Sequence, residues 1–137
     1  MAIEMNNQTW SFLDKKDRSD QDDVRMINYA KASLYHWRKS DKYSIVNEQR
    51  GQWLISHVYA ILERSDKALS YAKKTLKITE DNNLKDFDLA YAYESMDRAY
   101  SISDNKNKSK KWYKKAKNAG DLIEGDKEYF LLDLNSK

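Results

Sequence analysis

The sequence contains no cysteine and no proline, and it has only three glycines among its 137 residues. Without cysteine the chain can have no disulfide framework, no thiolate metal site and no thiol nucleophile. Strands need turns, and proline and glycine are the residues that most often mark them. Their scarcity therefore excludes an all-β fold and favours helices that are joined by polar turns.

Long apolar runs are missing as well. The longest, such as residues 53–55, are only a few residues long, so we expect no segment to span a bilayer and no membrane partner. The N-terminal stretch MAIEMNNQTW has no basic region followed by an apolar one, so we expect no signal peptide. With a mean hydropathy of −0.98, the chain is expected to be one soluble domain, residues 1–137, in the cytoplasm.

What the sequence does contain is apolar residues at helical spacing. Met26, Ile27, Ala30 and Leu34, for example, follow one another at intervals of one, three and four. The pattern predicts an all-α fold of about seven helices, arranged as stacked antiparallel hairpins. The predicted hairpins cover residues 3–38, 44–80 and 86–120, and a C-terminal capping helix covers 126–135.

Polar residues mark the predicted helix ends. Ser19 and Asp22 have the spacing of a capping box, and Asp66 and Asp86 are predicted N-caps. Gly120 is predicted to end the sixth helix, and Gly125 with Asp126 to open the last one. The first helix is predicted to end near residue 16.

Two segments of the chain resemble each other. Residues 52–77 align with residues 93–118 when Tyr59 is placed on Tyr100, a shift of 41 positions. Each segment reads as a helix, a short turn and a second helix. A single hairpin cannot bury its apolar face alone, whereas stacked hairpins can.

Both segments resemble the tetratricopeptide repeat. An apolar residue, Ile55 or Met96, lies four positions before the tyrosine, and Ala68 and Ala72 follow Tyr59 at nine and thirteen positions. The shift exceeds the usual period of about 34 residues, and the closing proline is missing. In the second segment, Ser109 and Tyr113 replace the residues that the pattern expects.

The segments ASLYHW (32–37), RGQWLISHVYAILERSDKALSYA (50–72) and DFDLAYAYESMDRAY (86–100) are also similar to a family of short bacterial repeat-type proteins without an assigned activity. These resemblances imply a superhelix of stacked hairpins. They also imply that the first helix of each hairpin lines a concave face, where a ligand peptide would lie.

One stripe of residues on this implied face is a candidate ligand-binding groove. Its arginines suit carboxylates or phosphates, and its aromatic rings offer apolar area with a polar tip. The alternative, that the rings pack between helices while the charges form interhelical pairs, stays open. The members on one helix are spaced by three and four, and a shift of 41 gives their counterparts: Arg50, Trp53 and His57, then Tyr91, Glu94 and Arg98.

Nothing in the sequence predicts catalysis. His36 and His57 are the only histidines, and they do not form an HExxH pair, so we expect no metal site. Three scattered glycines cannot build a phosphate loop or a dinucleotide fingerprint. We therefore expect a non-enzymatic protein- or peptide-binding module with no cofactor.

A lysine-rich helix raises one alternative. Residues 106–117 hold seven lysines and no acid, so that the rest of the chain carries −4, the difference between +3 and +7. With Trp112 and Tyr113 the segment has the composition of a weak nucleic-acid binder. It has no arginine, however, and we expect a solvated face and no nucleic-acid partner.

Self-association is the second alternative. Tyr35, Tyr43 and Tyr129 are predicted to be exposed, and the last helix is apolar. If such a surface mediates self-association, forming a homodimer would be the main role of the protein.

Overall fold

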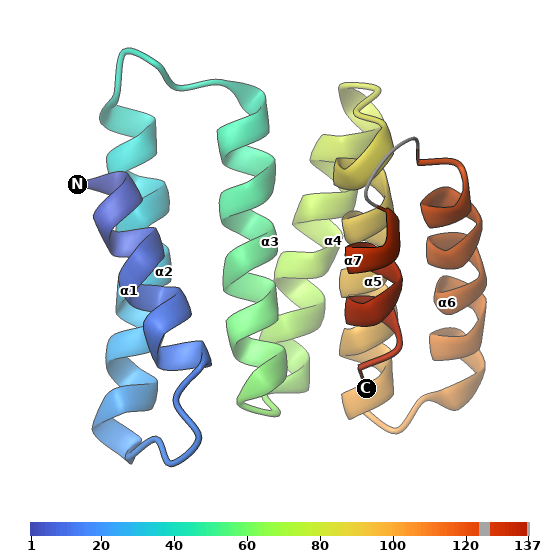
Figure 1. The fold of residues 1–137 in the computed structure, drawn as a ribbon, viewed down its shortest axis with the longest axis horizontal. Coiled ribbons are helices and arrows are strands. Elements are labelled where there is room, and N and C mark those ends of the chain that lie inside the picture. Colours follow the sequence, from blue (N-terminus) through green and yellow to red (C-terminus); the bar gives the residue numbers. More distant parts are fainter. Residues whose placement is uncertain (124–126, 137) are drawn as a thin grey trace.

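The structure, a computed structural model, describes residues 1–123 and 127–136, and in this part of the chain it is all-helical, with no strand (Figure 1). The all-α prediction is confirmed. The helices are α1 (Ala2–Leu13), α2 (Asp20–Lys39), α3 (Ile45–Ile61), α4 (Ser65–Asp81), α5 (Asp86–Ile102), α6 (Lys106–Asp121) and α7 (Lys127–Leu134). The predicted start of the last helix at Gly125 and Asp126 lies outside the described residues.

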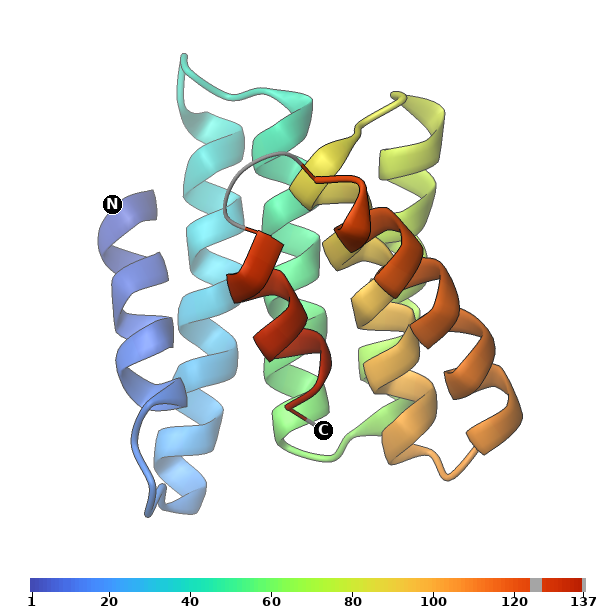
Figure 2. The ribbon, with the colours of Figure 1, turned by 45° about the vertical axis from the view of Figure 1, so that its right-hand side comes forward.

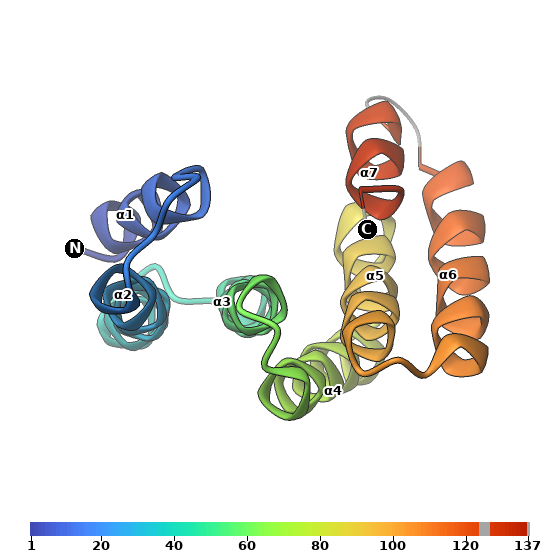
Figure 3. The ribbon, with the colours of Figure 1, turned by 90° about the horizontal axis from the view of Figure 1, so that it is seen from below.

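Consecutive helices pack as antiparallel hairpins. Helices α1, α3 and α5 run in one direction and α2, α4 and α6 in the other (Figure 1). Viewed from below, the chain follows a curve whose two tips are α1 and α7, and whose base is α3 and α4 (Figure 3). Helix α7 packs against α5 and α6, on the same side of the array as α1 (Figure 2).

The helix bounds repeat with a period of 41 residues. Helix α5 begins and ends 41 positions after α3, and α6 begins 41 positions after α4. The turns repeat too: Glu63 after α3 and Asp104 after α5 have left-handed φ values of 58° and 62°. In both turns the backbone N–H of the next residue donates to a carbonyl of the helix that has just ended. Arg64 donates to the Tyr59 carbonyl at 2.9 Å, and Asn105 donates to the Tyr100 carbonyl at 3.0 Å. These are Schellman motifs made without glycine.

This turn geometry corrects two predicted N-caps. Arg64 completes the Schellman motif and is itself the N-cap of α4, so the helix begins two residues earlier than an N-cap at Asp66 predicts. Lys85 is likewise the N-cap of α5. Asp66 and Asp86 therefore lie in the first turns, where a negative charge stabilises the helix dipole.

Side-chain hydrogen bonds cap the end of α1 and the start of α2. Helix α1 ends at Leu13, earlier than predicted, and the Arg18 guanidinium donates to the carbonyl oxygens of Phe12 and Leu13 at 3.2 and 3.3 Å. These bonds satisfy carbonyls that the helix end leaves unpaired. The predicted capping box of Ser19 and Asp22 is confirmed, with both bonds at 3.1 Å.

Two glycines allow close packing inside helices. A Cβ on Gly51 would lie 2.6 Å from Leu34 Cδ1, so this glycine lets α3 approach α2. A Cβ on Gly120 would lie 2.6 Å from the Phe130 ring. The prediction that Gly120 ends α6 is wrong: the helix continues to Asp121, and the glycine instead makes room for α7.

Candidate ligand-binding cavity

A cavity of about 340 Å³ opens on the concave side of the array. Four helices contribute to its wall: α1 and α7, which form the tips of the curve, and α3 and α5 between them (Figure 3). Its lining is Asn6, Trp10, Gln49, Arg50, Trp53, Leu54, Phe87, Asp88, Tyr91 and Asp133.

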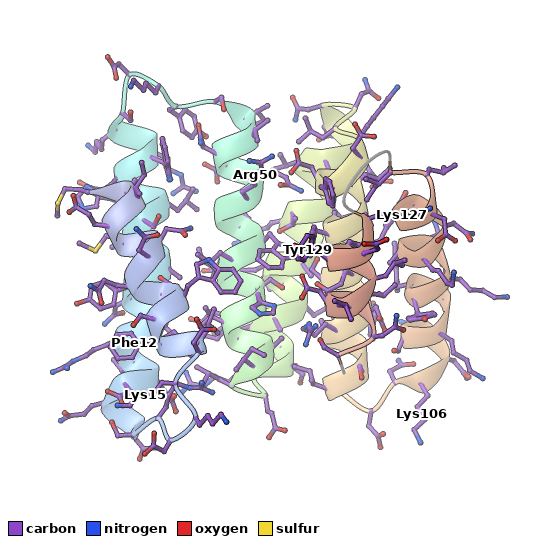
Figure 4. All side chains as sticks on the ribbon, viewed as in Figure 1. Phe12, Lys15, Arg50, Lys106, Lys127 and Tyr129 are labelled. Carbon is purple, nitrogen blue, oxygen red and sulfur yellow. The ribbon has the colours of Figure 1, made fainter. Side chains whose placement is uncertain are left out.

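Arg50 supplies the exposed positive charge of the cavity. It lies on α3, and its side chain is 66% exposed (Figure 4). Its Nε donates to Asp88 Oδ1 on α5 at 3.0 Å, whereas its two terminal amino groups make no hydrogen bond within the described part of the chain. The guanidinium is thus oriented by one carboxylate and still has donors for another.

A buried amide fixes the position of α3 beneath Arg50. The Gln49 Nε2 donates to Thr79 Oγ1 on α4 at 3.1 Å and to the Asp88 carbonyl on α5 at 3.0 Å. Gln49 is 1% exposed, so breaking these bonds would leave a buried polar group unpaired. One side chain therefore sets the register of three helices at the cavity.

Aromatic rings form the other wall. Trp53 stacks on His57, with ring centroids 4.9 Å apart. Trp53 and Tyr91 pack edge-on, with ring centroids 5.4 Å apart. Trp10, on α1, reaches over both, at 6.3 Å from Trp53 and 5.8 Å from His57. The Trp53 indole nitrogen is buried, and no hydrogen-bond acceptor for it lies among the described residues.

Tyr91 connects the cavity to the C-terminal helix. Its hydroxyl donates to Asp133 Oδ2 at 2.5 Å, and its ring meets Phe130 edge-on at 4.9 Å. Burial, and then the hydrogen bond to Asp133, raises the pKa of the Tyr91 hydroxyl above its ordinary value. The hydroxyl therefore remains a neutral donor at any physiological pH.

Glu94 and Arg98 lie outside the cavity lining. Arg98 Nε donates to Glu94 Oε2 at 2.7 Å within α5, and its NH2 group donates to the Asp133 carbonyl and to Ser136 Oγ, each at 3.1 Å. Both side chains are almost fully buried. The pair faces the chain's own C-terminal segment.

The structure thus brings three of the six predicted residues to the cavity, namely Arg50, Trp53 and Tyr91, and places His57 behind Trp53. Sequence reasoning missed Trp10 and Asp133, because their positions depend on how the terminal helices pack. The first-turn position of Asp88 on α5 gave no sign that it would orient Arg50. The period of 41 gave no signal for any of them.

The lysine-rich helix is solvated on its outer side. All seven lysines of 106–117 are exposed, and α6 lies at the end of the array (Figures 1 and 4). Lys108 lies over the Tyr100 ring, and Lys115 over Trp112, with the nitrogen 5.3 and 5.1 Å from the ring centroids. The neighbouring aromatic faces are thereby covered by the protein's own cations.

Neither a metal-binding cluster nor a membrane-spanning helix occurs in the described part of the chain. It holds no cluster of three or more histidine or acidic side chains that could bind a metal ion. Nor does any of its helices combine the length and the apolar character needed to cross a membrane.

Fold and cavity together define a class, an all-α protein of stacked helix hairpins with an aromatic cavity on its concave side. Comparisons with known protein families, with curated proteins and with solved structures returned no match.

Proposed function

We propose that this chain is a non-enzymatic binding module of the cytoplasm that holds a segment of a partner protein, or a peptide, in the cavity between α1, α3, α5 and α7. The observation that supports it best is the convergence of Arg50, Trp53 and Tyr91, an exposed guanidinium beside half-buried rings. The segment would carry an acidic residue and a large apolar one.

Each contact has a definite chemical role. The free terminal amino groups of Arg50 donate to a ligand carboxylate, and such charge-assisted bonds contribute about 1.5–3 kcal/mol each. Trp53 and Tyr91 pack against an aromatic or leucine side chain. A volume of 340 Å³ lies at the low end of the ~300–1,000 Å³ range of ligand pockets, which suits one or two side chains better than a large cofactor.

The unpaired indole of Trp53 supports the same proposal. A buried donor without an acceptor costs a fold about 1–3 kcal/mol. A shift of the Trp53 ring that brings this nitrogen to a ligand carbonyl would remove that cost.

The test is an array of short peptides in which one acidic residue and one aromatic or leucine residue are placed one to six positions apart. The array is probed with the wild type, with Arg50→Glu and with Arg64→Glu. Arg64 lies in the exposed turn after α3, away from the cavity, so its variant makes the same charge change as a matched control.

We expect the wild type and Arg64→Glu to retain the same peptides, and Arg50→Glu to lose at least tenfold in affinity. The proposal is wrong if no peptide is retained by the wild type. It is also wrong if a folded Arg50→Glu variant, checked by circular dichroism, binds every peptide as well as the wild type does.

A further inference from the structure

Helix α6 concentrates positive charge at one edge of the array. Seven of the twelve residues 106–117 are lysines, all seven are exposed, and the segment holds no acid. The helix lies at the right-hand edge of Figures 1 and 3, and α5 and α7, which pack against it, lie on its inner side. No residue of α6 lines the concave cavity. Its outer face is therefore a second surface, separate from that cavity.

The lysines of α6 form two flanks of this outer face. An α-helix turns by about 100° per residue, so residues on opposite flanks lie roughly 160° apart around the helix axis. One flank holds Lys106, Lys110 and Lys117, and the other holds Lys108 and Lys115. The exposed charge thus covers more of the circumference than contact with a flat partner would need.

No apolar side chain of α6 lies between the two flanks. The apolar side of the helix, with Ala116, is turned into the array and buried. A helix that binds a bilayer places apolar side chains in the interface, whereas the outer face of α6 offers cations and amides, with one acid at its end. The strip between the flanks holds Asn107, Lys111, Lys114, Asn118 and Asp121, all exposed.

Part of this charge has no counter-charge within the described part of the chain. Lys117 bonds to Asp121 at 3.1 Å, whereas Lys106, Lys110 and Lys114 form an ion pair with none of the described acids. These three follow one another at intervals of four residues, the spacing at which like charges on a helix repel. A polyanion would relieve the repulsion that the row costs the fold.

We infer that α6 binds double-stranded DNA by lying in the major groove, with its two lysine flanks toward the phosphates of the two strands. The major groove of B-DNA is about 12 Å wide, and an α-helix with its side chains is about 10–12 Å across. The rest of the chain carries −4, so repulsion turns it away from the duplex and α6 toward it. This binding goes beyond the proposed function and uses a different face of the molecule.

Two flanks of charge fit a groove better than a plane. A flat anionic surface such as a bilayer contacts one side of a helix and would leave one flank in water. A groove presents a row of phosphates on each side of the helix. The major groove of duplex RNA is deep and too narrow for side chains to read, so DNA is the better duplex. Phosphate contacts carry the affinity, which is therefore independent of sequence.

The test is fluorescence polarisation of a labelled DNA duplex of about 20 base pairs, two helical turns, titrated with the full chain at salt concentrations from about 50 to 200 mM. Five contacted phosphates predict a slope of about −4.5 for the logarithm of the binding constant against the logarithm of the salt concentration. An RNA duplex of the same sequence and vesicles of phosphatidylcholine and phosphatidylserine are the comparison probes.

Three double variants locate the contact, and each removes two exposed lysines. Two of them empty one flank each, and the third, on α4, is the matched control. We expect each flank variant to lose at least fivefold in affinity and to reduce the salt slope by about 1.8, and the control to keep the wild-type slope. Circular dichroism checks that all three fold. The variants are Lys106→Gln with Lys110→Gln, Lys108→Gln with Lys115→Gln, and Lys67→Gln with Lys73→Gln.

Three results overturn the inference. The first is no binding of the DNA duplex at the lowest salt concentration. The second is dependence on one flank only, together with equal or tighter binding of the vesicles, which would make the partner a planar anionic surface. The third is equal binding of the RNA duplex, which would exclude the major groove. All three leave the proposed function standing, because the variants do not touch Arg50 or Trp53.

Discussion

Arg98 Nε lies 2.7 Å from Glu94 Oε2, one turn away on α5, and the two side chains are 11% and 1% exposed. Arg98 also donates to the Asp133 carbonyl and to Ser136, so the ion pair joins the second hairpin repeat to the C-terminal segment. A charge pair at this depth is stable only while both partners are present.

We therefore predict that Arg98→Met strongly destabilises the protein. The substitution keeps a long apolar side chain but leaves the Glu94 carboxylate buried without its guanidinium, at a cost of about 3–5 kcal/mol. Urea denaturation measures the loss. Hydrogen exchange should show that Phe130 and Leu134, which α7 buries against the array, lose protection first.

A double variant, Glu94→Leu with Arg98→Met, should recover most of the stability. If it is no more stable than Arg98→Met, the loss of the guanidinium beside Glu94 is not the cause.

Acid should weaken the contact between α2 and α3. The Arg38 guanidinium bonds to Glu48, with help from Gln52 and Tyr43, and lowers the Glu48 pKa from 4.5 to about 2 against the effect of burial. Because the folded pKa is the lower one, this contribution is complete above about pH 4.5 and is lost as the pH falls toward 2. We expect a loss of about 1–2 kcal/mol, since half-exposed Arg38 is screened by water.

The measurement is the urea midpoint of the wild type and of Glu48→Gln between pH 2 and 7. Glu48→Gln should be less stable at pH 7, and the two proteins should converge near pH 2. A difference that stays constant over this range would show that Glu48 contributes through packing alone.

The sequence predicts the helices well because each rests on local information. Apolar spacing and caps such as Ser19 lie within a few residues of the helix that they define. The stripe that bears Arg50 and Trp53 is also predictable, since it needs only helical spacing and the period of 41. The engagement of Arg98 by α7 is not, because it depends on where a terminal helix docks. Trp10 reaches the cavity for the same kind of reason, through the packing of α1.

Glycine at the helix ends should stabilise this glycine-poor chain. Glu63 has a φ of 58°, a conformation that costs a residue with a Cβ about 1–2 kcal/mol. Glu63→Gly should therefore raise the free energy of unfolding by about 1 kcal/mol, as measured by thermal and urea denaturation. Glu63→Ala separates the backbone effect from loss of the side chain, and we expect no gain from it. Equal gains from both variants would contradict the backbone explanation.

Gly51 should tolerate even a single methyl group poorly. Alanine favours a helix over glycine by about 0.5–1 kcal/mol, but the new Cβ would lie 2.6 Å from Leu34 Cδ1 and 3.2 Å from its Cβ and Cγ. Because Leu34 is buried, we expect a net loss of about 1–2 kcal/mol for Gly51→Ala. Ser70→Ala, on the exposed side of α4, should instead be neutral or slightly stabilising. In a Leu34→Ala background the cost of Gly51→Ala should vanish, and an unchanged cost would mean that the clash lies elsewhere.

The lysines of α6 should repel one another measurably. Lys114 is exposed, and Lys110, Lys111 and Lys117 lie three or four positions from it on the same helix. Lys114→Glu replaces like-charge neighbours by opposite ones and should stabilise the fold by about 0.5–1 kcal/mol at low salt. Thermal denaturation in 1 M salt is the control, because a Debye length of about 3 Å should abolish the gain. A gain that persists in high salt would have to come from helix propensity.

The shared register of the two hairpins has a consequence for how such a chain could grow. Residues 45–85 hold one helix pair with its closing turn, and Asp86 begins the next pair 41 residues after Ile45. A tandem duplication of 45–85, inserted after Lys85, would keep the helix register and place a second α3-type helix against α4, where α5 now packs. Each added copy would bring another Arg50 and Trp53 to the concave side. The array could thus lengthen by one genetic event, without a new kind of turn.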